Sequence, residues 1–129
     1  MIKINNKQYD NYDTKIVWEN FETILSGKKI NGIAPFIEFN IKNNTLIGIE
    51  TRLPKEILEN MNINEKIDIS KCLTDITYED EKGWISIITG KYNCYLTRIS
   101  NNSFKIELEI DSKELEKINI NINDNIELL

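Results

Sequence analysis

The chain has 129 residues, of which 40% are hydrophobic and 29% are charged, and its formal net charge is −5. This length and apolar content are typical of a single globular domain over residues 1–129. An acidic chain with only two arginines is a poor fit to nucleic acid, whose phosphates must be neutralised by basic side chains. No apolar run approaches the ~20 residues that span a bilayer, so we expect no membrane association.

The first residues and the two cysteines indicate the expected compartment. Residues 1–7 lack the apolar stretch of a secretory signal, so we expect a cytoplasmic protein. Cys72 and Cys94 form no CxxC pair, and in a reducing compartment we expect free thiols rather than a disulfide. The excess of Ile, Asn and Lys is typical of the codon bias of an AT-rich bacterial genome, so the many asparagines alone indicate no function.

The absence of histidine narrows the chemistry that the chain can perform. Histidine is the commonest general base, the usual partner of a nucleophilic Ser or Cys, and the commonest transition-metal ligand. We therefore assign no catalytic residue, no metal ligand and no cofactor, and we expect no enzymatic activity.

The N-terminal half predicts strands that are joined by tight turns. A short alternation at Ile2 and Ile4 opens the chain, and Ser26-Gly27-Lys28-Lys29 favours a turn. Gly32 is expected to mark an irregular point. Asn43-Asn44 favours a hairpin turn, because Asn tolerates the left-handed backbone conformation that such turns use. The expected strands are 14–25 (as one strand or two), 36–41 and 46–53.

One short helix is predicted near 54–61. Pro54 suits a first helical position, where its missing N–H costs no hydrogen bond. Ile57, Leu58 and Met61 then follow at helical spacing. Beyond the helix we expect a turn over 79–83 and a bend at Gly90. The expected strands in this part are 67–69, 73–78, 84–89 and 92–100.

Residues 104–111 alternate apolar and charged side chains at every position. Successive side chains of a strand point to opposite faces, so this pattern predicts a strand with the core on one side and a mostly acidic surface on the other. Asn101-Asn102 favours a hairpin turn before this strand. Residues 112–117 favour one helical turn or a loop, and 118–123 repeat the alternation with Ile and Asn.

These elements predict a mainly β fold. We expect a small antiparallel β-barrel or β-sandwich of about eight to ten short strands with the one short helix near 54–61. From Thr74 onward the chain reads as a continuous antiparallel meander, and 118–123 is a candidate exposed edge strand.

Two acidic segments are the candidate partner-binding regions. One is the polar turn before Trp84, and the other is the acidic side of the strand over 104–111. Ordinary turn chemistry and the solvated side of a sheet are the alternative readings of these segments. The candidate residues are Glu79, Asp80, Glu81, Trp84, Glu107, Glu109 and Asp111.

Three hypotheses of function remain open. The first is a non-catalytic protein-binding module of the immunity, antitoxin or effector-inhibitor type that engages a basic protein partner, because acidic faces steer basic targets. The second is a structural or self-assembling component, such as a phage-derived particle protein or a homo-oligomer built on exposed strand edges. The third is a small-ligand barrel or an enzyme that uses carboxylates.

Overall fold

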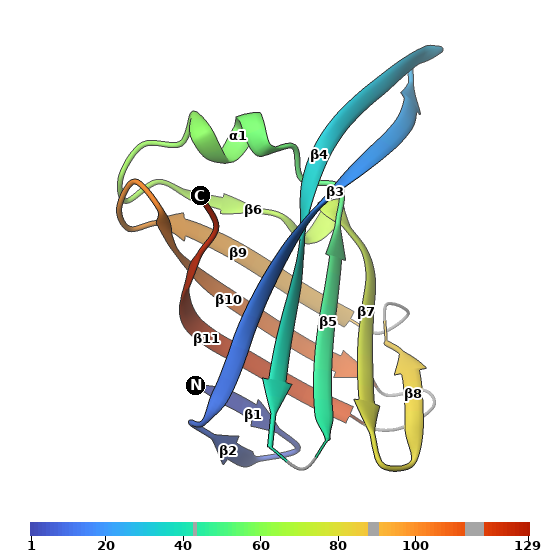
Figure 1. Cartoon of the computed structure of the whole chain (residues 1–129), viewed down its shortest axis with the longest axis vertical. Coiled ribbons are helices and arrows are strands. Elements are labelled where there is room, and N and C mark those ends of the chain that lie inside the picture. Colours follow the sequence, from blue (N-terminus) through green and yellow to red (C-terminus); the bar gives the residue numbers. More distant parts are fainter. Residues whose placement is uncertain (43, 88–90, 113–117) are drawn as a thin grey trace.

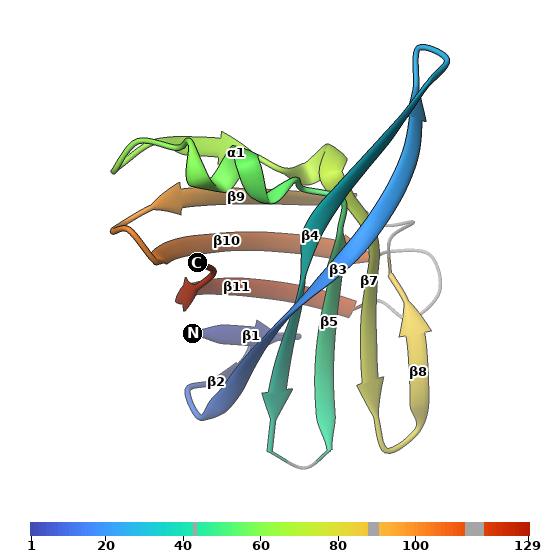
Figure 2. The same cartoon turned by 45° about the horizontal axis from the view of Figure 1, so that its top comes forward.

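The computed structural model describes residues 1–42, 44–87, 91–112 and 118–129. The expectations for Gly90, Asn43 and the segment 113–117 fall outside these residues. The fold is mainly β and consists of two antiparallel sheets, with one short α-helix. Figures 1 and 2 show the strands of one sheet running across those of the other. In the described residues neither sheet closes on itself, so the fold is a β-sandwich.

The five-stranded sheet has the order β3-β4-β5-β7-β8. Its strands are β3 (Tyr12–Leu25), β4 (Lys28–Ile41), β5 (Thr45–Thr51), β7 (Leu73–Asp80) and β8 (Gly83–Ser86).

The six-stranded sheet has the order β2-β1-β11-β10-β9-β6. Its strands are β1 (Ile2–Ile4), β2 (Lys7–Tyr9), β6 (Lys66–Asp68), β9 (Lys91–Arg98), β10 (Ser103–Ser112) and β11 (Ile118–Glu127).

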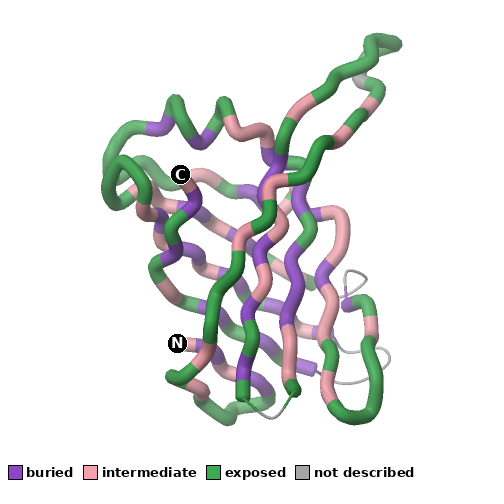
Figure 3. Tube along the Cα trace, in the orientation of Figure 1, coloured by how far each residue is buried: buried purple, intermediate pink, exposed green. Residues whose placement is uncertain are grey.

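The core lies between the sheets and consists mostly of isoleucine. On the five-stranded sheet Ile37, Ile49 and Ile76 lie opposite one another on adjacent strands, and all three are buried. On the six-stranded sheet the apolar residues of β10 and β11 face them, and Figure 3 shows buried positions alternating with more exposed ones along both strands. The predicted half-buried strand over 104–111 is therefore confirmed.

The helix α1 (Lys55–Glu59) confirms the prediction of a short helix near 54–61. It packs beside β4, and its Leu58 is buried. A five-residue helix is not stable by itself, so burial of Leu58 holds it in place. A single 3₁₀ turn over Ser70–Cys72 precedes β7.

Two expectations about connectivity are wrong. The chain from Thr74 onward is not one meander, because β7 and β8 belong to the five-stranded sheet and β9, β10 and β11 to the other. Residues 118–123 are not at an edge either, because β11 is paired with β10 on one side and with β1 on the other. Alternation reports that a strand has a buried face, and it carries no information about which neighbours the strand has.

The strand β4 also runs straight through Gly32, where an irregular point was expected. The ring of Phe21 on β3 lies over this glycine, and a Cβ at position 32 would lie 2.6 Å from the ring. Gly32 therefore makes room for a cross-strand aromatic side chain. The turn before it is confirmed, since Ser26 and Gly27 have φ values of 52° and 77°.

Arg98 fastens α1 to the turn between β9 and β10. Its Nη1 donates hydrogen bonds to the carbonyl oxygens of Glu59 (3.1 Å) and Met61 (2.7 Å). Its Nη2 and Nε donate to the carbonyl oxygens of Asn101 (2.9 Å) and Ser100 (3.2 Å). One of the two arginines is thus engaged by backbone carbonyls and is not offered to a ligand.

Replacing Arg98 by lysine tests this role. An ammonium cannot reach all four carbonyl oxygens at once, so we expect R98K to lower the free energy of unfolding by about 1–2 kcal/mol. The measurement is urea denaturation. The matched control is R52K, at an exposed position, where a change under about 0.5 kcal/mol is expected. Equal effects at the two positions would contradict the structural role of Arg98.

Candidate functional site: two opposite polar faces

The seven candidate residues do not form one surface. Glu79 and Trp84 are cross-strand partners on the outer face of the five-stranded sheet, with Asp80 and Glu81 next to them at the β7–β8 turn. The acidic residues of β10 lie on the outer face of the six-stranded sheet, on the opposite side of the sandwich. No single partner-binding surface of ordinary size includes both groups.

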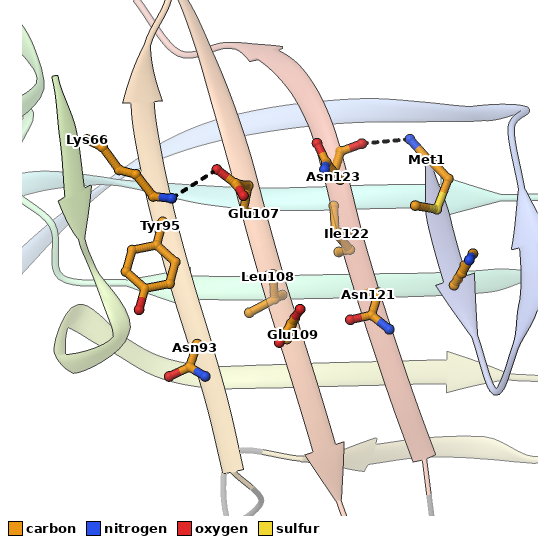
Figure 4. Close-up of a pocket in the computed structure, with 11 residues that line it drawn as sticks. Met1, Lys66, Asn93, Tyr95, Glu107, Leu108, Glu109, Asn121, Ile122 and Asn123 are labelled. Atoms are coloured by element: carbon orange, nitrogen blue, oxygen red, sulfur yellow. Dashed lines mark hydrogen bonds and ion pairs between the residues drawn. The ribbon is translucent and has the colours of Figure 1, made fainter. Parts of the chain in front are cut away.

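The outer face of the six-stranded sheet has a shallow hollow of about 500 Å³. Figure 4 shows Tyr95 of β9 between Lys66 of β6 and Asn93, with Glu107 and Glu109 on the neighbouring strand. Lys66 Nζ lies 3.5 Å from Glu107 Oε1 and 4.8 Å from the centre of the Tyr95 ring. The carboxylate of Glu107 is therefore already partnered within the chain.

Charges of both signs mix on this outer face. Lys91 of β9 lies opposite Asp111 of β10, and Lys105 Nζ is also 4.0 Å from Glu107 Oε1. The expected mostly acidic surface thus becomes nearly neutral once its neighbours are in place. Its outward charged residues are Lys3, Lys66, Lys91, Lys105, Asp68, Glu107, Glu109, Asp111 and Glu127.

The outer face of the five-stranded sheet is strongly acidic, and we call it the acidic face. In the β-ladder register, the residues opposite the outward positions of β4 and β5 also point outward, which fixes its membership. It has six carboxylates and two lysines, a net charge of −4. Its charged residues are Asp13, Lys15, Glu19, Lys28, Glu38, Glu50, Asp75 and Glu79.

Apolar side chains interrupt the carboxylates of the acidic face. Phe36 and Leu46 are half-buried on it, and Trp84, on the edge strand β8, is 68% exposed. Phe36 lies across Gly48, where a Cβ would come within 3.0 Å of the ring and 2.7 Å of Thr77 Oγ1. The face therefore offers aromatic contact area among negative charges.

Internal hydrogen bonds orient two of these carboxylates. Thr74 Oγ1 donates to Glu50 Oε1 at 2.8 Å, and Ser86 Oγ donates to Asp75. Such bonds hold the acceptor oxygens in fixed directions without removing their charge.

Sequence reasoning missed most of the acidic face, because its carboxylates come from four strands. One signal was present: the alternation of Ile37, Phe39 and Ile41 toward the core places Glu38 and Asn40 on the opposite side. The neighbours of Glu38 across the sheet could not be named without the strand order.

The two cysteines are free, as expected. Cys94 is buried between the sheets, and burial raises the pKa of its thiol from an ordinary value of 9.0 to about 12. Burial also raises the pKa of the half-buried Cys72. Both thiols are thus held in the protonated form, which is a poor nucleophile.

The raised pKa of Cys94 predicts a loss of stability in alkali. The unfolded chain releases this proton near pH 9, whereas the folded chain keeps it until about pH 12. The stabilisation is complete below pH 9 and is lost as the pH rises toward 12, by at most about 1.4 kcal/mol per pH unit. Urea denaturation between pH 8 and 11 should therefore show a shallower decline for Cys94→Ala than for the unmodified chain.

The half-buried Cys72 is the control for that series. Cys72→Ala should alter the decline less than Cys94→Ala does, because the Cys72 thiol is less desolvated. Identical pH dependences for the unmodified chain and Cys94→Ala would contradict the assignment.

Comparison of the chain with protein-family models, with curated proteins and with solved structures gave no match. Within the described residues no three Cys, Asp or Glu side chains come together in a way that could hold a metal ion. No helix in the same residues has the length and apolar character needed to cross a membrane.

Proposed function

We propose that this chain is a non-catalytic protein-binding module that holds a basic protein partner on its acidic face. In this proposal the module works in the cytoplasm, as an immunity, antitoxin or effector-inhibitor protein does. Of the candidate residues, Glu79 and Trp84 take part directly, and Asp80 and Glu81 extend the surface at the β7–β8 turn.

The observation that carries the proposal is the concentration of charge on one face. Six carboxylates and two lysines lie on one sheet surface, while the opposite surface has five carboxylates and four lysines. A one-sided field of this kind accelerates encounter with a positively charged partner and disfavours acidic competitors.

The sheet also supplies rigidity and contact area. The carboxylates of β4, β5 and β7 lie on strands paired on both sides, so little conformational entropy is lost when a partner docks. Phe36, Leu46 and Trp84 add the apolar and aromatic area that dominates the energy of protein interfaces.

Charge reversal on the two faces tests the proposal. The chain is immobilised and used to capture proteins from its native lysate at low salt, and bound proteins are identified by mass spectrometry. We expect a basic protein that binds the unmodified chain and is lost at least 10-fold with E38K/E50K/E79K, because its electrostatic complement is removed. The matched control E107K/E109K/E127K makes the same charge change on the opposite sheet and should retain capture.

Three outcomes would contradict the proposal. The first is the capture of nothing, or only of acidic proteins, by the unmodified chain. The second is equal capture by the unmodified chain and E38K/E50K/E79K. The third is loss of capture in the control alone, which would move the site to the six-stranded sheet.

Trp84 provides a test that is independent of charge. Because this side chain is 68% exposed, Trp84→Ala should leave the free energy of unfolding nearly unchanged. If Trp84 contacts the partner, its truncation should weaken the Kd by about 10-fold or more, measured by calorimetry with the captured protein. An unchanged Kd would remove Trp84 from the interface.

A further inference from the structure

The strand β3 has a free edge along its whole length. Its 14 residues pair with β4 on one side, and no described strand pairs with it on the other. The remaining sheet edges are short, since β2 and β6 have three residues each and β8 has four. Short edge strands limit unwanted pairing, whereas a long edge presents a row of main-chain donors and acceptors.

The β3 edge also has neither a bulge nor a proline, although it carries charged residues. Its pairing with β4 runs without a register shift from Tyr12 opposite Ile41 to Leu25 opposite Lys28, so no bulge bends the edge away. The strand contains no proline. It is therefore ready to accept another strand.

The outer part of this hairpin projects from the sandwich, and we call residues 20–33 the arm. Strand β4 pairs with β5 only from Phe36 to Ile41. The part of β4 that precedes Phe36 pairs with β3 alone, so the arm is a ribbon of two strands (Figures 1 and 2). Ile24 is 76% exposed and Ile33 is 44% exposed. A ribbon of two strands with exposed apolar residues is marginally stable alone, and pairing with a further strand would stabilise it.

The charges of β3 are self-complementary in one register. When two copies of β3 pair antiparallel about a two-fold axis at Val17, Lys15 lies opposite Glu19 of the partner subunit, and this happens twice. Lys15 and Glu19 are exposed and make no ion pair in the described part of the chain. Lys15 lies opposite Glu38 of β4 without a close ion pair, so both charges can pair across the axis.

The neighbouring registers lack this match. An axis at Ile16 would place Asp13 against Glu19 of the partner subunit, which repels. An axis at Trp18 leaves Lys15 opposite Phe21, and an axis at Glu19 brings two glutamates together. Directly opposed like charges destabilise a sheet and opposite charges stabilise it, so the Val17 register is favoured.

The other face of the strand fits the same register. There Ile16 lies opposite Trp18 of the partner subunit, again twice. Both side chains are half-buried in the single chain. Aromatic residues opposite β-branched ones are favourable cross-strand pairs.

We propose that two copies of this chain join β3 to β3 in antiparallel fashion about a two-fold axis at Val17. The five-stranded sheets of the two copies then form one continuous sheet of ten strands. Lys15 and Glu19 also belong to the acidic face, but the two proposals are tested separately because the charge reversals used above avoid β3.

Cross-linking at the axis tests the register. Residues opposed on adjacent antiparallel strands have Cα atoms about 4.5–5.5 Å apart, a distance that a disulfide spans. Val17→Cys should therefore form a disulfide-linked dimer under mild oxidation. The control Thr23→Cys, which lies on the same side of β3 but opposite Asn11 of the partner subunit, should not. Equal cross-linking of the two variants would overturn the proposal.

Charge exchange tests the interface itself by sedimentation at up to about 100 µM. The unmodified chain should be dimeric, and K15E and E19K should each be at least 10-fold weaker, because like charges then meet twice. The double variant K15E/E19K restores both ion pairs and should recover the dimer. An equimolar mixture of K15E and E19K should form a heterodimer for the same reason.

These variants change exposed residues, and circular dichroism verifies that each remains folded. A monomeric unmodified chain would overturn the proposal. So would a dimer that is insensitive to K15E and E19K, or a double variant that stays as weak as the single ones.

Discussion

The burial of alternating isoleucines between two crossed sheets determines which residues of this molecule face the solvent. Ile37, Ile49 and Ile76 on one sheet face the apolar side of β10 and β11 on the other. Because a strand has only two faces, turning these residues inward assigns every intervening residue to a solvent-facing surface. The two outer faces, with all their charges, are by-products of how the core is packed.

The two outer faces differ because of which strands become neighbours. On the six-stranded sheet Lys66 of β6 forms an ion pair with Glu107 of β10, and Lys105 of β10 lies 4.0 Å from the same carboxylate. On the five-stranded sheet no comparable cation reaches Glu50 or Glu79 in the described residues. Charge is thus segregated by topology, although along the chain the acidic residues appear concentrated in its second half.

The sequence was sufficient for the elements that local rules determine. Alternation predicted β10 and the start of β11, helical spacing after Pro54 predicted α1, and Ser26-Gly27 predicted a hairpin turn. It was insufficient wherever the answer depends on pairing between distant segments. The placement of Glu79 and Glu107 on opposite faces follows from strand order, as does the interior position of β11. Gly32 was misjudged because its role depends on Phe21, eleven residues earlier in the chain but directly across the hairpin.

The pairing of β1 with β11 has a consequence for the kinetics of folding. Ile2 lies opposite Ile122, so the six-stranded sheet reaches its full width only when segments at opposite ends of the described chain meet. Closing a loop of that length costs entropy before any contact rewards it. Domains dominated by such distant pairings fold on a scale of roughly milliseconds to seconds. Until β11 is in place, β1 has no strand to pair with, and β2 pairs only with β1. The main-chain amides of these two strands should therefore be among the last to become protected from hydrogen exchange as the chain folds.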